Sequence, residues 1–146
     1  MGSISRRHLM GAALGAALPN PDLKFQISNS KTAYIAAYDT ESPACLQACR
    51  RIVEVHKRLQ MPATFFITGK TLEANVKEYK ELLADPLFEV ASHTWSHKML
   101  RENVFCGRAA SEEEKKDEVF RAKELIERVF ERPCLGLRAA CGFDNG

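Results

Sequence analysis

The sequence lacks the features that mark a membrane protein, a nucleic-acid-binding protein or a disordered chain. No apolar run approaches the roughly 20 residues that a membrane span needs. Lys and Arg number 21 against 19 Asp and Glu, so the net charge is only +2, and no basic block stands out for nucleic acid. The 146 residues contain no internal repeat or low-complexity segment. With 45% hydrophobic and 27% charged residues, the composition fits one globular domain.

Cysteine is present, but not at the spacing of a thiolate metal site. The five cysteines include no CxxC pair, which argues against a zinc knuckle or a thioredoxin-type motif. Because five is odd, at least one thiol is unpaired within a monomer. Cys45 and Cys49 share one face of a predicted helix and are expected to be small buried residues. A disulfide between Cys134 and Cys141 stays open.

The first thirty residues have the pattern of an export signal. Arg6 and Arg7 precede a short apolar stretch that ends at Leu18. Such a pattern is typical of a secretory signal, and the paired arginines resemble a twin-arginine signal. The alternative is a basic N-terminus with a short amphipathic helix. A signal would place residues 1–30 outside the fold, leave 31–146 as the domain, and indicate a bacterial-type protein exported to the periplasm or beyond the cell.

Strands and helices are predicted to alternate after residue 30. Apolar residues recur at helical spacing after Pro43, between 72 and 83, and after Ser111, which forms a capping box with Glu114. Strands buried on both faces that alternate with helices indicate a parallel sheet or barrel, hence an α/β fold. Four short apolar runs are predicted to be these strands, at 33–38, 63–67, 87–91 and 134–137.

Two groups of charged residues are expected to be solvated. The run 112–118 is predicted to be the exposed face of the last helix. His56 is expected at the surface, because Lys57 and Arg58 follow it on a predicted helix.

Titratable residues follow three of the predicted strands. Asp39 and Glu41 come after the first, His93 and His97 after the third, and Arg138 after the fourth. Because active sites of α/β folds lie beyond the C-terminal ends of parallel strands, these side chains are expected to meet at one edge. The two imidazoles share a side if their segment turns helically. Two imidazoles and a carboxylate are a common zinc set that leaves one position for water.

Several segments resemble the polysaccharide deacetylases (NodB homology domain, carbohydrate esterase family 4). Residues 89–97, EVASHTWSH, are similar to the second motif of that family, E-I-G-x-H-[ST]-x-x-H. Residues 63–67, ATFFI, resemble its A-T-F-F-V strand. Residues 38–41 and 136–142 stand at the places of its first and third motifs. The resemblance implies a metal-dependent hydrolase that removes N-acetyl groups from an amino-sugar polysaccharide: peptidoglycan, a chitin-like polymer or an exopolysaccharide.

The resemblance also implies roles for individual residues. His93 and His97 would bind a divalent metal, for which we expect zinc. Asp39 would be the general base, and Arg138 would orient it. Where the family commonly has a second aspartate as a metal ligand, this chain has Thr40.

A variant of the first motif, D-x-[DE], suggests which carboxylate replaces that second aspartate. Asp39-Thr40-Glu41 fits this variant, so we assign the carboxylate ligand to Glu41, with Asp39 as the alternative.

The chain also departs from the family pattern. Ala140 and Cys141 replace a proline and an aromatic residue of the third motif, and the last two family motifs have no counterpart up to Gly146. We therefore expect an incomplete (β/α) barrel of about four parallel strands rather than seven, truncated at its C-terminus, with a second chain as a source of the missing half. The alternatives to a deacetylase are a non-catalytic remnant that binds metal or glycan, and a thiol-based or structural domain in which the histidines are incidental.

Overall fold

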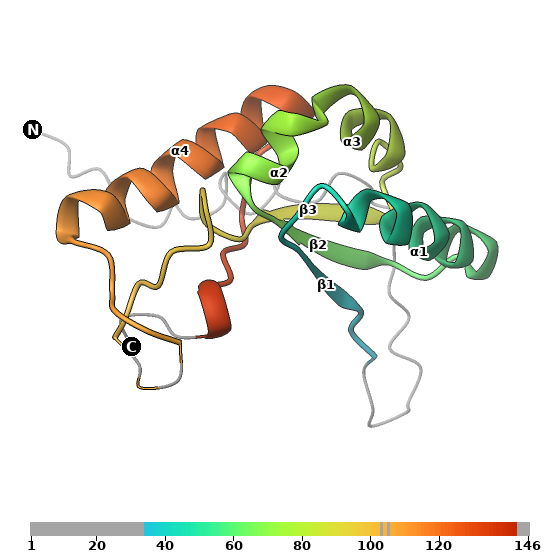
Figure 1. Ribbon diagram of the computed structural model, residues 1–146. Helices are drawn as coiled ribbons and strands as arrows, with labels where there is room; N and C mark the ends of the chain where they lie inside the picture. The colour runs from blue at the N-terminus through green and yellow to red at the C-terminus, as the bar shows by residue number, and fades with distance from the viewer. Residues whose placement is uncertain (1–33, 103, 105, 143–146) are drawn as a thin grey trace, which may run out of the picture. The chain divides into compact units, whose positions relative to one another are not determined.

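The structure, a computed structural model, describes residues 34–102, 104 and 106–142 (Figure 1). The predicted export signal lies outside these residues. Within the described part of the chain, no helix combines the length and the apolar character needed to cross a membrane.

Over the described ranges, three parallel strands and four α-helices form the fold, which confirms the α/β class. The strands lie in the order β1 (Ala37–Thr40), β2 (Ala63–Ile67) and β3 (Phe88–Ser92). The helices alternate with them along the chain: α1 (Cys45–Leu59), α2 (Gly69–Ala74), α3 (Val76–Leu82) and α4 (Glu112–Phe130), with a short 3-10 turn, η2, at Ala140–Gly142.

The helices cover one face of the sheet (Figure 1). Side chains alternate along β2, so that Phe65 and Ile67 are fully buried while Thr64 and Phe66 are partly exposed on the opposite face. The buried positions of β2 and β3 pack with apolar residues of all four helices into one core, which includes Cys49, Val53, Leu72, Tyr79, Leu83, Phe88, Val90, Ala122, Leu125 and Ile126.

The predicted fourth strand is wrong. Among the described residues, segment 134–137 joins the sheet only through an isolated parallel bridge between Ser92 and Leu137. Its apolar composition predicted burial on both sides, yet Leu135 and Leu137 are 69% and 46% exposed. The first strand also lies later than predicted, because pairing with β2 begins at Ala37.

Two polar residues expected at the surface are buried. His56 is 5% exposed, and its ring bonds the Tyr38 hydroxyl at 2.8 Å and the Met61 carbonyl at 2.9 Å. Glu118, inside the run predicted to be solvated, is 3% exposed. Both predictions failed because they relied on charged neighbours in the sequence. Such neighbours do not indicate which residues from other parts of the chain will contact the side chain in the folded structure.

The helix predicted at 72–83 is divided in two. Asn75 interrupts it with a φ of −144°, so that α2 ends before it and α3 begins after it. The predicted capping box at Ser111 and Glu114 is confirmed. Glu114 also accepts a hydrogen bond from Lys98 Nζ at 2.7 Å, which ties the start of α4 to the segment that follows β3.

Gly69 opens α2 directly beneath an indole ring. A Cβ atom at this position would lie 2.7 Å from Trp95 Cζ3 and closer still to Cε3. Trp95 is itself 5% exposed and belongs to the core cluster. The absence of a side chain at position 69 therefore lets the segment after β3 pack on the start of α2.

We predict that Gly69→Ala lowers the free energy of unfolding by about 1–3 kcal/mol, because the added methyl group overpacks against Trp95. Urea denaturation measures the change. Lys70→Ala, at the next and exposed position, is the control and should stay within about 0.5 kcal/mol of the wild type. A Gly69→Ala variant as stable as Lys70→Ala would contradict this packing.

At acid pH, Glu114 should no longer contribute to the stability of the folded state. Its hydrogen bond with Lys98, followed by those with Ser111, lowers the pKa of Glu114 from 4.5 to about 2. Because the folded-state pKa lies below the unfolded value, the stabilisation is complete above about pH 4.5 and is lost as the pH falls towards 2. We predict that Glu114→Gln lowers the Tm at neutral pH. The difference in Tm between the wild type and this variant should narrow as the pH falls from about 4.5 towards 2. Glu113→Gln is the control, and a difference that persists near pH 2 would contradict the assignment.

Candidate metal centre

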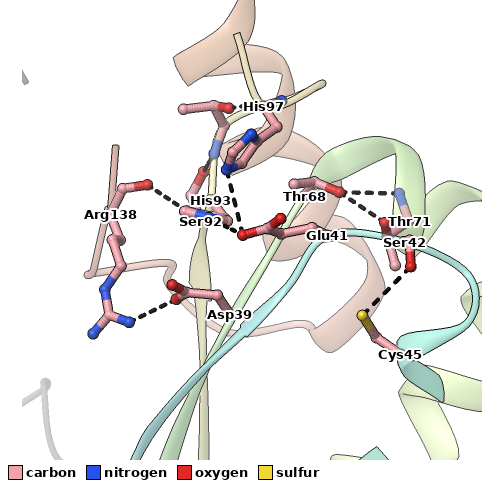
Figure 2. Close-up of polar contacts among 11 residues, drawn as sticks. Asp39, Glu41, Ser42, Cys45, Thr68, Thr71, Ser92, His93, His97 and Arg138 are labelled. Atoms are coloured by element: carbon pink, nitrogen blue, oxygen red, sulfur yellow. Dashed lines mark hydrogen bonds and ion pairs between the residues drawn. The ribbon is translucent and has the colours of Figure 1, made fainter. Parts of the chain in front are cut away.

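Three predicted ligands converge at the carboxyl edge of the sheet. Glu41 Oε1 lies 3.3 Å from His93 Nε2 and 3.4 Å from His97 Nε2, and all three ligand atoms fall within 4.8 Å of one another. Figure 2 shows the Glu41 carboxylate directed at both imidazoles. The side chain of His93 is almost fully buried, whereas that of Glu41 is 47% exposed, so the group faces solvent on one side.

The strand register explains the convergence. Thr40 of β1 pairs with Ile67 of β2, and Ile67 pairs with Ser92 of β3. Glu41 and His93 are each the next residue after this shared register. The pairing of the strands therefore places both residues at the carboxyl edge of the sheet.

The separations between the Glu41 oxygen and the two imidazole nitrogens suit a tetrahedral cation. Ligands about 2.0–2.2 Å from zinc stand about 1.6 bond lengths apart, which is roughly 3.3 Å. The two distances from Glu41 match this separation. A carboxylate and two imidazoles also supply the oxygen and nitrogen donors that zinc takes, so the residues fit the expected metal.

A backbone contact fixes the tautomer of His93. Its Nδ1 donates to the carbonyl oxygen of Arg138 at 2.7 Å. Because a carbonyl only accepts, Nδ1 carries a hydrogen, so Nε2, which faces Glu41, is the ring nitrogen that would bind a cation. Metal-ligating histidines are commonly oriented in this way by a partner on the other ring nitrogen.

The segment between the histidines does not turn helically, so the predicted reason for their meeting is wrong. Thr94 and His97 both adopt left-handed backbone conformations, with φ values of 65° and 62°. His97 N donates to Thr94 Oγ1 at 3.1 Å. The tight turn, rather than a helix, brings the two rings to a centroid separation of 4.8 Å.

Asp39 and Arg138 form the second part of the site. Arg138 Nη1 donates to Asp39 Oδ1 at 2.6 Å, and the guanidinium lies 4.1 Å from the ring centre of Phe66. Asp39 is not within the three-residue ligand group. The structure thus separates the two carboxylates: Glu41 faces the imidazoles and Asp39 faces the arginine (Figure 2).

Thr40 takes no part in the site. It is 1% exposed, and its hydroxyl contacts Cys49 Sγ at 3.7 Å within the core. Side chains alternate along an extended segment, so Asp39 and Glu41 share the side opposite to Thr40. Of these two carboxylates, Glu41 is the one that faces the histidines.

The described cysteines are free and show no disulfide. Burial raises the pKa of Cys49. Burial also opposes ionisation of Cys45, but hydrogen bonds from Ser42 and from the backbone at Glu41 outweigh it and lower the pKa. The contacts of Cys45 and Cys49 are hydroxyl groups rather than an imidazole, which gives no support to a thiol-based function.

Sequence reasoning missed the support behind the histidines. Ser96 donates two hydrogen bonds to the buried Glu118 of α4. Glu118 stands four residues before the buried Ala122 and seven before the buried Leu125, which is the spacing of one helix face. That periodicity was a signal that Glu118 belongs to the inward side.

Comparison with known proteins identifies the family and agrees with the α/β fold. The sequence model of the family described as polysaccharide deacetylase matches residues 26–145. No curated protein shows a significant match.

Among solved structures, the peptidoglycan deacetylase PdaC from Bacillus subtilis is 25% identical, with a TM-score of 0.58 over 79% of this chain and 52% of that one. A family 4 carbohydrate esterase from Bacillus anthracis is 23% identical, with a TM-score of 0.60 over 75% and 49%. BA3943 from the same organism, described as a CE4 family pseudoenzyme, is 20% identical, with a TM-score of 0.62 over 76% and 37%. The chain thus spans about half or less of their length.

The separation of the carboxylates predicts which one binds metal. Glu41→Gln should weaken zinc binding at least a hundredfold, because loss of a direct ligand should exceed the 10–100-fold cost of losing an outer partner. Asp39→Asn should retain zinc within a few-fold. Isothermal titration with zinc measures both, and Glu54→Gln on the exposed side of α1 is the control. The reverse order of affinities would assign the ligand to Asp39.

Proposed function

The chain belongs to the polysaccharide deacetylase family, and on that premise we propose that it is a zinc-dependent hydrolase that removes N-acetyl groups from an amino-sugar polysaccharide. The observation that carries the proposal is the convergence of Glu41, His93 and His97 on one point beside the Asp39–Arg138 pair. This arrangement offers a cation site and a separate carboxylate base at one solvent-facing edge.

The base is held in place by the arginine. Arg138 bonds Oδ1 of Asp39, which leaves Oδ2 to take the proton from an attacking water. A divalent cation in the site would polarise the acetyl carbonyl and acidify a water. The guanidinium is itself fixed over Phe66, so the carboxylate is oriented before substrate arrives.

Departure of the amine requires an acid. Of the histidines in the described part of the chain, two are the proposed ligands and the third, His56, is buried among Tyr38 and the helices. We propose that protonated Asp39 returns its proton to the leaving nitrogen. One group then serves as base and acid in turn.

The substrate is proposed to be peptidoglycan, a chitin-like polymer or an exopolysaccharide. The similar PdaC is described as a peptidoglycan deacetylase, which supports the first of these. The paired Arg6 and Arg7 support a place outside the cytoplasm, where such polymers lie. A second chain that pairs with the exposed Leu135 and Leu137 is proposed as a partner.

A second candidate function is metal or glycan binding without hydrolysis. Thr40, which stands where the family commonly has an aspartate ligand, favours it. The similar BA3943 is described as a CE4 family pseudoenzyme, which supports this second candidate.

Acetate release tests the two candidates. We expect the zinc-loaded protein to release acetate from an N-acetylated chitooligosaccharide or from peptidoglycan. Asp39→Asn should lower the rate by at least about 10²–10⁴-fold while zinc stays bound, because the group that moves the proton is lost and the three proposed ligands remain. Glu54→Gln is the control and should keep the wild-type rate. Binding of zinc and glycan without acetate would favour the second candidate, and zinc loss in Asp39→Asn would remove the assigned role of that residue.

A further inference from the structure

The turn that carries the two histidines is held from α2 on one side. Gly69 N donates to the Thr94 carbonyl at 3.0 Å, and Lys70 N donates to the Trp95 carbonyl at 2.9 Å. The Trp95 ring lies against Gly69, and the Arg121 guanidinium of α4 stacks 3.6 Å from its centre. The first half of the turn is therefore fixed by backbone contacts and by packing.

The second half is held by one carboxylate. Glu118 Oε2 accepts from Ser96 N at 2.7 Å, and Glu118 Oε1 accepts from Ser96 Oγ at 2.5 Å. Glu118 is 3% exposed, and no Lys, Arg or His nitrogen within the described ranges lies within 4.0 Å of it. A buried carboxylate without an ion pair is costly unless it is hydrogen-bonded, so these bonds account for its position.

The residue next to Ser96 needs such support. His97 has a φ of 62°, a left-handed conformation that a residue with a Cβ atom adopts at some cost. Its own N–H is satisfied by Thr94 within the turn. Glu118 acts one residue earlier: through the Ser96 N–H it fixes the peptide that joins Trp95 to Ser96, and through Ser96 Oγ it fixes the side chain of the residue that precedes His97.

We propose that Glu118 is a positioning residue for the metal centre. Its buried carboxylate anchors Ser96, and Ser96 holds His97 in the conformation that directs Nε2 at Glu41. The inference rests on the proposed cation site but is independent of the proposed hydrolysis. Glu118 thus acts through Ser96 and does not touch the metal, the substrate or the reacting atoms.

Zinc affinity and the cobalt spectrum test this role. Glu118→Ala leaves the Ser96 N–H without an acceptor, and we expect zinc to bind about 10–100-fold more weakly, as when other outer partners of a ligand are lost. Glu118→Gln can accept from Ser96 N and donate to Ser96 Oγ, so it should restore affinity to within about threefold. Glu124→Ala, exposed on the same helix, is the control.

The visible spectrum of bound Co²⁺ separates positioning from stability. Its band position and intensity depend on ligand geometry, which a loss of global stability alone does not change. We expect the folded Glu118→Ala protein to show a shifted and altered Co²⁺ spectrum and Glu118→Gln a spectrum like the wild type. If Glu118→Ala does not fold, Ser96→Ala, which loses only the Oγ bond, should still shift the spectrum and weaken zinc about three- to tenfold.

Two results would overturn the inference. The first is a folded Glu118→Ala or Ser96→Ala protein with wild-type zinc affinity and Co²⁺ spectrum. The second is a wild-type chain that binds no zinc, which would remove the cation site and this inference together. Zinc binding without acetate release would contradict only the proposed hydrolysis.

Discussion

The shared register of three parallel strands is the constraint on which the site depends. Thr40, Ile67 and Ser92 stand side by side at the carboxyl end of the sheet. The residues that follow them come directly after the paired positions, and His93 N still donates to the Ile67 carbonyl, so Glu41 and His93 lie close together. A shift of one strand by one residue would reverse its side chains and send the ligand to the other side. Core packing of Phe65 and Ile67 beneath the helices fixes that register, and thus links burial to the position of the site.

The sequence allowed the α/β fold, β2 and the capping box to be predicted, because each depends on residues close together in the chain. It also allowed the members of the site to be named, because strand ends converge in any parallel sheet. Contacts between distant segments were not predictable. Glu118 and His56 each stand among charged neighbours, and only the folded chain supplies Ser96 and Tyr38 as their partners. The expected strand at 134–137 failed for the same reason, since apolar composition does not specify a pairing partner.

The turn after β3 shows how a strained local conformation is maintained. Two residues with positive φ stand within five positions, and neither is glycine. Their cost is offset from three directions: the start of α2, the stacked Trp95 and Arg121, and the carboxylate of Glu118. Gly69 has no side chain, and the Trp95 indole occupies the space that a Cβ atom would fill, so the turn can pack against α2. The imidazole positions therefore reflect packing far more than the spacing of the histidines in the sequence.

Arg138 joins the two parts of the site through two different chemical groups. Its main-chain oxygen holds the ring of His93, whereas its guanidinium holds Asp39. Every amino acid offers the first group, but only arginine offers the second with its planar, charged donors. Under the proposed mechanism, exchange of this side chain would therefore remove the support of the base and leave the contact that orients His93 in place. A descendant that binds the proposed cation without hydrolysis would then be one substitution away.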